Sequence, residues 1–356
     1  MALTATATLQ TRNDVMKNLA MTQVHVVQES PNRPNIKLST VQCAKKDYEG
    51  IFSWLIDEVK AKKEQAERVI VYCRTLQQCR ELYGLFFHEL GCKKDDPRLP
   101  IAMYHSESPS DMQASVVSSF SKEDGHIRVL FSSVAFGMGV DVKGVHTIIH
   151  LGVPGDPASF MQESGRAGRD GTPSLSLLLT YPGVFQDSKV DSAMKDYISN
   201  KHECRRKLIL NHFGHDLKEC HPDPAHICCD ICSASCTCGG NVCNNAHAFL
   251  AETKLNALDL GSNIDMSSLP RRHLDMDTRL ELNEKLTLLR LSQMSMEVHS
   301  ANFLAGEDIV SGIPLQTVDK IVAEAHLVFT FEEFQRRYTI YSNYTAVWDL
   351  LGETVG

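Results

Sequence analysis

The sequence of 356 residues contains no Gly-Lys dipeptide, so it has no phosphate-binding loop of the GxxxxGK[ST] type. It also lacks an acidic box at a strand end that could place Mg²⁺, because IDEV at 56–59 reads as the face of an amphipathic helix. Loops of that type hold nucleotide phosphates through backbone amides and a lysine. The chain alone is therefore not expected to hydrolyse a nucleotide.

Other features are also missing. The N-terminal MALTATATLQTRNDV has no basic region followed by an apolar run, so it is not a secretory signal, and no membrane span or membrane partner is expected. The net charge of −8 argues against a generally basic coat for nucleic acid, although it leaves room for a local groove. Residues 254–356 hold 9 Lys and Arg against 15 Asp and Glu, so the C-terminal part carries −6 of that charge.

The sequence contains twelve cysteines. In a chain of this length without a signal peptide, they indicate a reducing compartment and metal binding rather than a disulfide scaffold. The composition favours a nuclear or cytosolic protein.

Short apolar runs alternate with helical patterns through the first half of the chain. We predict buried strands over 68–73, 101–105, 127–133, 146–153 and 174–181, with helices over 75–90 and 108–120. Strands that alternate with helices form a parallel sheet covered on both faces. The fold class is therefore α/β.

Two loops carry candidate binding residues. In the first, VLFSSVAFGMGVDVKGV (129–145), Gly137 and Gly139 allow close backbone approach and Asp141 follows, so the loop could hold a ribose or a phosphate. A strand-to-turn glycine pair is as often only a structural device. The second, QESGRAGRDG (162–171), places Arg166 and Arg169 three residues apart, and an exposed pair on a short helix could bind a phosphate bidentately. The alternative for this pair is a solvated helix face.

Four segments in order make the pattern specific: ALTATAT at 2–8, VIVYCRT at 69–75, FSSVAFGMGVD at 131–141 and QESGRAGRDG. Together they resemble motifs III to VI of superfamily 2 helicases, and most closely those of the RecQ family. The resemblance covers roughly residues 1–235. It implies a RecA-like motor lobe at 45–200 and an ATP-dependent 3′-to-5′ DNA helicase of the nucleus, acting on single-stranded or forked DNA in unwinding, repair and recombination.

The resemblance also implies roles for individual residues. Arg169 would be an arginine finger on the γ-phosphate and Arg166 its partner, with Gln162, Gly139 and Asp141 near the nucleotide. Three further residues, Arg74, Thr75 and Ser133, would contact the backbone of a single strand. ATP and Mg²⁺ would bind only with a first RecA-like lobe, supplied in cis or in trans, because Met1 directly precedes motif III.

A second group of residues is rich in cysteine. Cys229 and Cys232 form a CxxC knuckle, whose two thiolates can face one tetrahedral Zn²⁺. The resemblance extends to the zinc subdomain of RecQ helicases and would add Cys204 and Cys220 as ligands. Buried cysteines without a metal, or substitution of one thiolate by His221 or His226, are the alternatives. The roles of the other cysteines of the segment stay open: Cys228, Cys236, Cys238 and Cys243.

The remaining segment has amphipathic patterns at 275–299 and 316–336, with Leu280, Leu286, Leu289 and Met294 on one approximate stripe. Its negative charge repels phosphate, so we expect a small helical accessory domain rather than a duplex reader. The predicted domains are the end of a first lobe with a linker (1–44), the second lobe (45–200), a zinc-binding helical subdomain (201–243) and a helical region (244–356).

Two hypotheses for the function follow. In the first, the chain is a portion of a RecQ-like helicase whose first lobe lies elsewhere. In the second, it is a zinc-stabilised module that binds nucleic acid or a partner without turnover. Walker A and DExH motifs encoded upstream of Met1 would distinguish the two.

Overall fold

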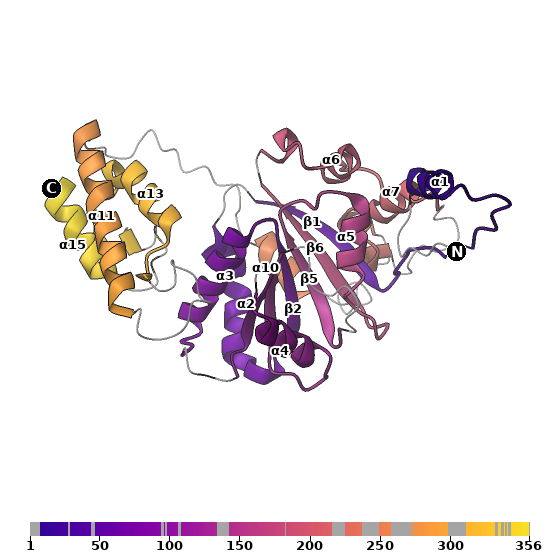
Figure 1. Ribbon diagram of the computed structural model, residues 1–356, viewed down its shortest axis with the longest axis horizontal. Helices are drawn as coiled ribbons and strands as arrows, with labels where there is room; N and C mark the ends of the chain where they lie inside the picture. The colour runs from indigo at the N-terminus through magenta and orange to yellow at the C-terminus, as the bar shows by residue number, and fades with distance from the viewer. Residues whose placement is uncertain are drawn as a thin grey trace. The chain divides into compact units, whose positions relative to one another are not determined.

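The computed structural model describes residues 8–27, 29–43, 47–93, 96, 98–105, 108–133, 142–181, 183–215, 225–236, 249–257, 272, 274–297, 311–331, 334–335, 338, 340 and 343–355. The chain divides into two compact units (Figure 1). The first unit comprises residues 1–74 and 104–261, and the second comprises 75–103 and 262–356.

Six strands form one sheet in the order β1-β6-β5-β2-β4-β3. Their bounds are β1 Ile36–Gln42, β2 Arg68–Cys73, β3 Ile101–Tyr104, β4 Val129–Ser132, β5 Val145–Leu151 and β6 Ser174–Thr180. The pairs β1–β6, β6–β5, β5–β2 and β2–β4 are all parallel. The predicted α/β class and all five predicted strands are confirmed.

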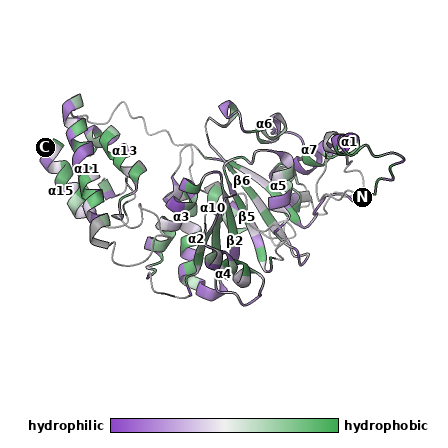
Figure 2. Ribbon diagram, in the orientation of Figure 1, coloured by the Kyte–Doolittle hydropathy of each residue, from purple (hydrophilic) through white to green (hydrophobic). Residues whose placement is uncertain are grey.

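The sixth strand, β1, was not among the predicted ones. Its sequence IKLSTVQ mixes apolar and polar residues, yet its first four residues are buried. β2, β4 and β6 are buried along their whole length, as expected for parallel strands with both faces covered. Figure 2 shows hydrophobic residues along β2.

The helices of the first unit are α1 Leu9–Asn18, α2 Tyr48–Lys62, α4 Ser110–Phe120, α5 Pro157–Ser164, α6 Ser192–Ser199, α7 Arg205–His212, α8 Asp230–Ala234 and α10 Leu250–Ala257. Short 3-10 turns lie at η1 Lys63–Gln65, η2 Val184–Gln186 and η4 Ala225–Ile227.

Helices cover both faces of this sheet. Lys37 and Ser39 of β1 contact Glu252 of α10, with Nζ–Oε2 at 2.7 Å and Oγ–Oε1 at 2.5 Å. On the neighbouring strand, Ser176 meets Ser164 of α5, with the two hydroxyl oxygens 2.7 Å apart. Lys37 pairs in register with Leu175, so Ser176 points to the other face. α10 and α5 therefore lie on opposite sides.

In the second unit, α3 Leu76–Glu89 begins with a capping box made by Thr75 and Gln78. The C-terminal helices are α11 Met276–Glu297, α13 Leu315–Glu324 and α15 Tyr344–Val355, with η5 Ala325–Leu327 after α13. These three helices share one hydrophobic core.

Two details of the predicted C-terminal helices were wrong. The pattern over 316–336 is not one helix, because α13 ends at Glu324, and Val328 and Phe334 enter the shared core beyond it. Leu286 and Leu289 face this core as predicted, but Leu280 is 59% exposed and Leu282 takes the buried position instead. Among the described helices, none is long and apolar enough to cross a membrane.

Candidate functional site

The two arginines of QESGRAGRDG lie in the turn that follows α5. Asp156 caps this helix by accepting a hydrogen bond from the Ser159 amide (2.8 Å), and the helix ends at Ser164. Arg169 is exposed, whereas the side chain of Arg166 is buried at 5% exposure. The expectation of an exposed pair on a helix was therefore wrong, because only one of the two guanidiniums faces solvent.

Arg166 lies within a buried polar group beneath α5. It hydrogen-bonds the phenol of Tyr72 on β2; burial raises the pKa of Tyr72, and the charge of Arg166 opposes that rise. The Tyr72 ring stacks on His150 of β5, with ring centroids 5.5 Å apart. His150 Nε2 lies 3.1 Å from Glu163 Oε2 on α5, and both side chains are buried. The positive charge of Arg166 is therefore held on a support built from three elements.

The backbone of the turn is fixed by Gly168, whose φ of +56° favours glycine. A Cβ at this position would collide with Asn35 Nδ2 and would lie 2.5 Å from Ser174 Oγ and 2.8 Å from the Thr172 carbonyl oxygen. Asn35 Nδ2 donates to the carbonyls of Gly168 and Thr172 at 2.8 and 2.9 Å. The Gly168 amide donates to the carbonyl of Val145, the first residue of β5 (2.9 Å). The turn is thus anchored at the amino ends of the strands.

Arg33, just before β1, also holds the turn. Its guanidinium donates to the carbonyls of Gly165 (3.1 Å), Ala167 (3.4 Å) and Gly168 (2.8 Å). Partial burial lowers the pKa of Arg33, and the nearby charge of Arg169 lowers it further. Two positive charges therefore lie close together at this turn, which favours a negatively charged ligand.

The end of the turn is fixed by Asp170. Its carboxylate lies 2.9 Å from His146 Nε2 and accepts from the amide and hydroxyl of Thr172 at 3.0 and 2.7 Å. The hydrogen bonds from His146 and Thr172 lower the pKa of Asp170.

Arg74 and Ser133 follow the carboxyl ends of two paired strands, because Tyr72 of β2 pairs with Ser132 of β4. Arg74 is half-buried, and its Nη2 lies 3.5 Å from Asp187 Oδ2. The Ser133 amide donates to the Tyr104 carbonyl (3.2 Å). The backbone of the arginine turn is anchored at the other edge, at the amino end of β5, but the Arg166 side chain reaches Tyr72 near the carboxyl ends of the strands.

The other nucleotide and DNA residues lie as follows. Thr75 is exposed, and its hydroxyl accepts a hydrogen bond from the Gln78 amide (3.2 Å) at the start of α3. Gln162 is an exposed residue of α5. Gly139 and Asp141 lie outside the described residues.

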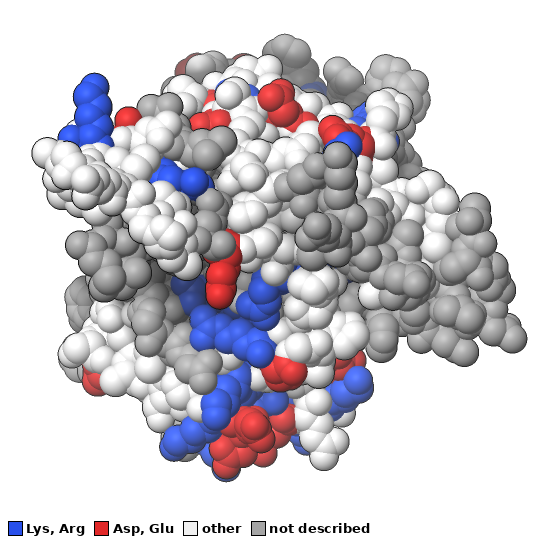
Figure 3. Space-filling model, turned by 90° about the vertical axis from the view of Figure 1, so that its right-hand side faces the viewer, with Lys and Arg blue, Asp and Glu red and all other residues white. Residues whose placement is uncertain are grey.

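Basic side chains are not spread evenly over the surface. Figure 3 shows Lys and Arg gathered in the middle of one face, with a group of Asp and Glu below them. The net charge of −8 therefore coexists with a locally basic face. Such a face can attract phosphate groups despite the overall charge.

Four cysteines form a second site in the same unit. Cys204 caps α7, Cys229 caps α8, and the sulfurs of Cys204, Cys228, Cys229 and Cys232 all lie within 4.8 Å of one another. The Sγ atoms of Cys204 and Cys228 are 3.5 Å apart. Hydrogen bonds from Cys204 and Cys228 lower the pKa of the Cys229 thiol. The pKa values of Cys228 and Cys232 are raised, the first by hydrogen bonds to Cys204 and Cys229 and the second by burial, so Cys229 is the member of the cluster that favours the thiolate form.

The geometry of this cluster fits zinc. A tetrahedral site with Zn–S distances of ~2.3 Å has sulfurs ~3.8 Å apart; in the cluster one pair of sulfurs is 3.5 Å apart and no pair is more than 4.8 Å apart. Three of the predicted ligands, Cys204, Cys229 and Cys232, are brought together. The fourth predicted ligand, Cys220, lies outside the described residues, and Cys228 occupies the cluster. Nearby, Cys236 Sγ lies 3.6 Å from His226 Nδ1.

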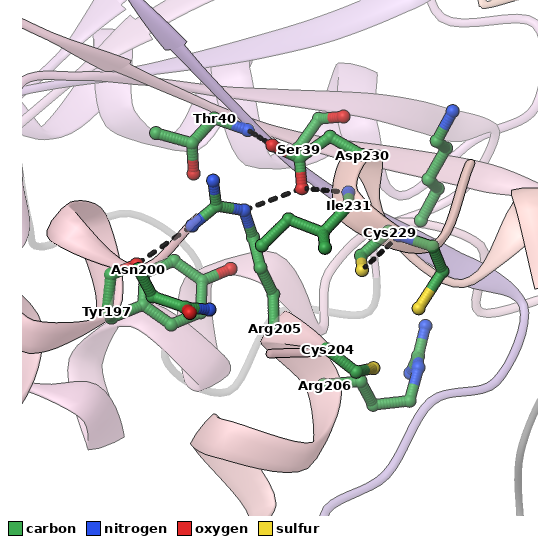
Figure 4. Close-up of polar contacts among 12 residues, drawn as sticks. Ser39, Thr40, Tyr197, Asn200, Cys204, Arg205, Arg206, Cys229, Asp230 and Ile231 are labelled. Atoms are coloured by element: carbon green, nitrogen blue, oxygen red, sulfur yellow. Dashed lines mark hydrogen bonds and ion pairs between the residues drawn. The ribbon is translucent and has the colours of Figure 1, made fainter. Parts of the chain in front are cut away.

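An ion pair between buried Arg205 and partly exposed Asp230 fixes α7 and α8 around the cysteines (Figure 4). Arg205 Nε donates to Asp230 Oδ1 at 2.6 Å, and Arg205 Nη1 donates to the Tyr197 carbonyl at 2.8 Å. The other oxygen of Asp230 accepts from the Thr40 amide of β1 (3.3 Å). The pair therefore connects the cysteine segment to the edge of the sheet.

Sequence reasoning missed several residues that support the two sites: Arg33, Asn35, Tyr72, His150, Glu163, Arg206 and Asp230. An Asn or Arg directly before a strand gives little signal of its own. The dipeptides Arg205-Arg206 and Cys229-Asp230 lie beside predicted ligands, so a search for charges flanking the cysteines could have found these two.

Comparisons with known proteins match the two parts of the chain that contain the arginine turn and the cysteine cluster. The family model described as the helicase conserved C-terminal domain matches residues 50–171, and the RecQ zinc-binding model matches residues 187–233. The ATP-dependent helicase SGS1 of Saccharomyces cerevisiae is 30% identical over 257 residues, covering 66% of this chain and 16% of that protein. The probable ATP-dependent DNA helicase RecS of Bacillus subtilis is 36% identical over 187 residues, covering 52% of this chain and 35% of that protein.

A third relative is the ATP-dependent DNA helicase Q-like 2 of Arabidopsis thaliana, 29% identical over 66% of this chain and 32% of its own length. The chain thus spans about a third or less of these relatives. Among solved structures, Dbp5 of Saccharomyces cerevisiae bound to RNA and ADP BeF3 is 18% identical, with a TM-score of 0.42 over 55% of this chain and 48% of that one.

Proposed function

Because this chain is the C-terminal region of a RecQ-family helicase, we propose that it is the second motor lobe and zinc subdomain of an enzyme that unwinds DNA 3′-to-5′ with ATP. The lobe would occupy residues 45–200 and the zinc subdomain 201–243, with a first-lobe remnant and linker at 1–44 and a helical region at 244–356. The enzyme would act on single-stranded or forked DNA in repair and recombination, in the nucleus.

The observation that carries this proposal is the arginine turn. Arg169 is exposed on a turn held by Arg33, Asn35 and Gly168, while Arg166 is buried against Tyr72. A guanidinium held in this way can enter a neighbouring site with little loss of conformational entropy. We assign Arg169 as the arginine finger. We assign Arg166 as the buried residue that attaches the turn to the sheet through its hydrogen bond to Tyr72.

The nucleotide itself would be held between two lobes. The first lobe would supply the phosphate-binding loop and the residues that place Mg²⁺, in cis or in trans. In this chain Gln162, Gly139 and Asp141 would line the nucleotide. Arg169 would stabilise the negative charge that develops on the γ-phosphate during transfer.

DNA would bind at the carboxyl ends of β2 and β4. Arg74 and Ser133 follow the carboxyl ends of paired strands, and with Thr75 they would contact the backbone of a single strand. Arg74→Ala should weaken single-strand binding several-fold and reduce its salt dependence by about one phosphate contact. Fluorescence anisotropy over a series of salt concentrations measures both. Unchanged affinity and salt slope in a folded variant would contradict this assignment.

The cysteine cluster would hold a structural zinc ion through Cys204, Cys229, Cys232 and one further thiolate. The described contacts favour Cys228 in that position, and Cys220 is the ligand implied by family resemblance. A zinc ion bound by four thiolates has no open position, so its contribution is to stabilise the fold of the subdomain.

Reconstitution tests the function. The chain alone should hydrolyse no ATP above background, since it contains no phosphate-binding loop. Adding a first RecA-like lobe with GKS and DExH motifs, fused before the ALTATAT segment, should produce hydrolysis that DNA stimulates. Robust hydrolysis by the chain alone, or none by a folded fusion, would refute the proposal, and the second result would favour a non-catalytic binding module.

A further inference from the structure

A continuous set of contacts joins the cysteine cluster to the arginine turn. Its first link is Arg206 of α7, which lies two residues after Cys204 and is almost fully buried at 2% exposure. Its guanidinium donates to the Cys228 carbonyl (3.3 Å) and to the Ile36 carbonyl. One side chain therefore contacts both the cluster and the start of β1.

The same guanidinium reaches the segment before β1. Arg206 Nη1 donates to the carbonyl of Arg33 and to the side-chain oxygen of Asn32, each at 2.8 Å. These bonds fix the backbone from which the Arg33 side chain extends. Because Arg206 takes four acceptors with two nitrogens, moving the Cys228 carbonyl changes the arrangement of the whole set.

The second link is Arg33 itself. Its three hydrogen bonds go to carbonyls on both sides of Arg166 and just before Arg169. These carbonyls lie outside regular secondary structure, and the planar guanidinium fork supplies donors to them; the Gly168 carbonyl also accepts from the Gly171 amide and from Asn35. The conformation that presents Arg169 thus depends on a residue more than a hundred positions away in the sequence.

We propose that Arg33 is a positioning residue for Arg169, and that Arg206 makes this positioning depend on the folded cysteine cluster. For Arg169 the inference rests on the proposed function, since the finger role belongs to that proposal. The hydrogen-bonded path does not rest on it. Loss of metal at the cysteines would loosen the arginine turn through Arg206 and Arg33.

Hydrogen exchange on the full chain tests the path without nucleotide or DNA. The amides of Arg166, Ala167, Gly168 and Gly171 have backbone acceptors and therefore protection to lose. In zinc-loaded protein, Arg33→Ala should raise their exchange rates by about tenfold, the scale of one charge-assisted hydrogen bond. Arg33→Lys should restore little, because an ammonium lacks the fork. Restoration by lysine would mean that only charge matters, and would overturn the positioning role.

Arg128→Ala is the matched control. Arg128 is also buried, and it donates to the carbonyls of Ala66, Gly125 and His126, none of which belongs to the turn or bonds to it. It should leave the exchange of the four turn amides within about twofold of wild type. An equal rise in both variants would show a general loss of stability and overturn the inference.

Zinc removal tests the second link. A chelator should raise exchange at the four turn amides in the wild-type chain, and should add little in Arg33→Ala, where the path is already cut. Additive effects would overturn the role of Arg206.

In the reconstituted motor, Arg33→Ala should lower turnover more than it changes the KM for ATP. If Arg169→Ala alone lowered turnover, Arg33 would not position the finger; if neither variant did, the finger role would fail while the exchange result stood.

Discussion

The arginine turn and the cysteine cluster are built in opposite ways within the same unit. The turn is held by the protein itself, through Arg33, Asn35 and Gly168, but under the proposed function its exposed Arg169 would act only on a phosphate supplied by another lobe. The cluster contains a full set of four sulfur ligands, and under the proposed function a zinc ion would join them. The turn is therefore held in place without a ligand but cannot act chemically by itself, whereas the cluster has all its ligands but would need the ion for its stability. Their failures should differ accordingly.

The largest expected effect is at the cluster. Cys229→Ala should abolish stoichiometric zinc binding and unfold residues 200–235, because the binding free energy of a structural zinc, on the order of 10 kcal/mol, is available only to the folded state. Elemental analysis and circular dichroism with and without chelator measure both effects. Cys92→Ala, at a free cysteine outside the cluster, is the control. Full helicity and zinc below about half an equivalent in the wild-type chain would contradict a metal-dependent fold.

At the turn, removal of the exposed guanidinium should leave the fold intact and affect only chemistry. Arg169→Ala in the reconstituted motor should lower turnover by roughly 10³-fold or more, the scale of an arginine finger, and should change nucleotide affinity much less. Arg169→Lys should not restore turnover, since an ammonium lacks the planar fork. Steady-state kinetics measure the effect on turnover, and the midpoint of thermal unfolding shows whether the fold is intact. Normal turnover in the Arg169→Ala motor would show that the turn is an ordinary surface feature.

An intermediate effect is expected where the cluster joins the sheet. Asp230→Ala removes the partner of buried Arg205 and an acceptor for the Thr40 amide. Such a loss should reduce the free energy of unfolding by about 3 kcal/mol, the lower end for breaking a buried pair, because Asp230 is partly exposed. Glu203→Ala breaks only the exposed pair with Lys207 nearby and should cost well under 1 kcal/mol. Equal costs in urea denaturation would show that the Asp230 pair is no more than a surface contact.

The same contrast explains what could be predicted from the sequence. Apolar runs such as 68–73 predict their strands because burial on both faces leaves an uninterrupted signal, and the CxxC of Cys229 and Cys232 predicts a shared ion because the two ligands are local. β1 escaped prediction since Lys37 and Ser39 are polar and become buried only against Glu252, more than 200 residues later. The burial of Arg166 was not predicted for the same reason, because its partner Tyr72 lies far away in the sequence, on β2. Local spacing can be recognised in a single sequence, whereas contacts between residues far apart in the chain cannot.

The smallest expected effect sharpens the view of the turn as a self-supported structure. Hydrogen bonds from His146 and Thr172 lower the pKa of Asp170 below the value of about 3.9 that an unfolded chain would show. The folded state therefore binds this proton more weakly than the unfolded state. The resulting stabilisation is fully present above pH ~5 and is lost as the pH falls through 4 toward the folded pKa. Because Asp170 is about half exposed, its contribution is at most ~1 kcal/mol.

Asp170→Asn should thus be slightly less stable than the wild-type chain at pH 7, and the two should converge near pH 3, as followed by urea denaturation at each pH. Asp57→Asn, at an exposed position of α2, should match the wild type throughout. A difference for Asp170→Asn that persisted unchanged at low pH would mean that the carboxylate charge does not support the turn, and that its geometry rests on Arg33, Asn35 and Gly168 alone.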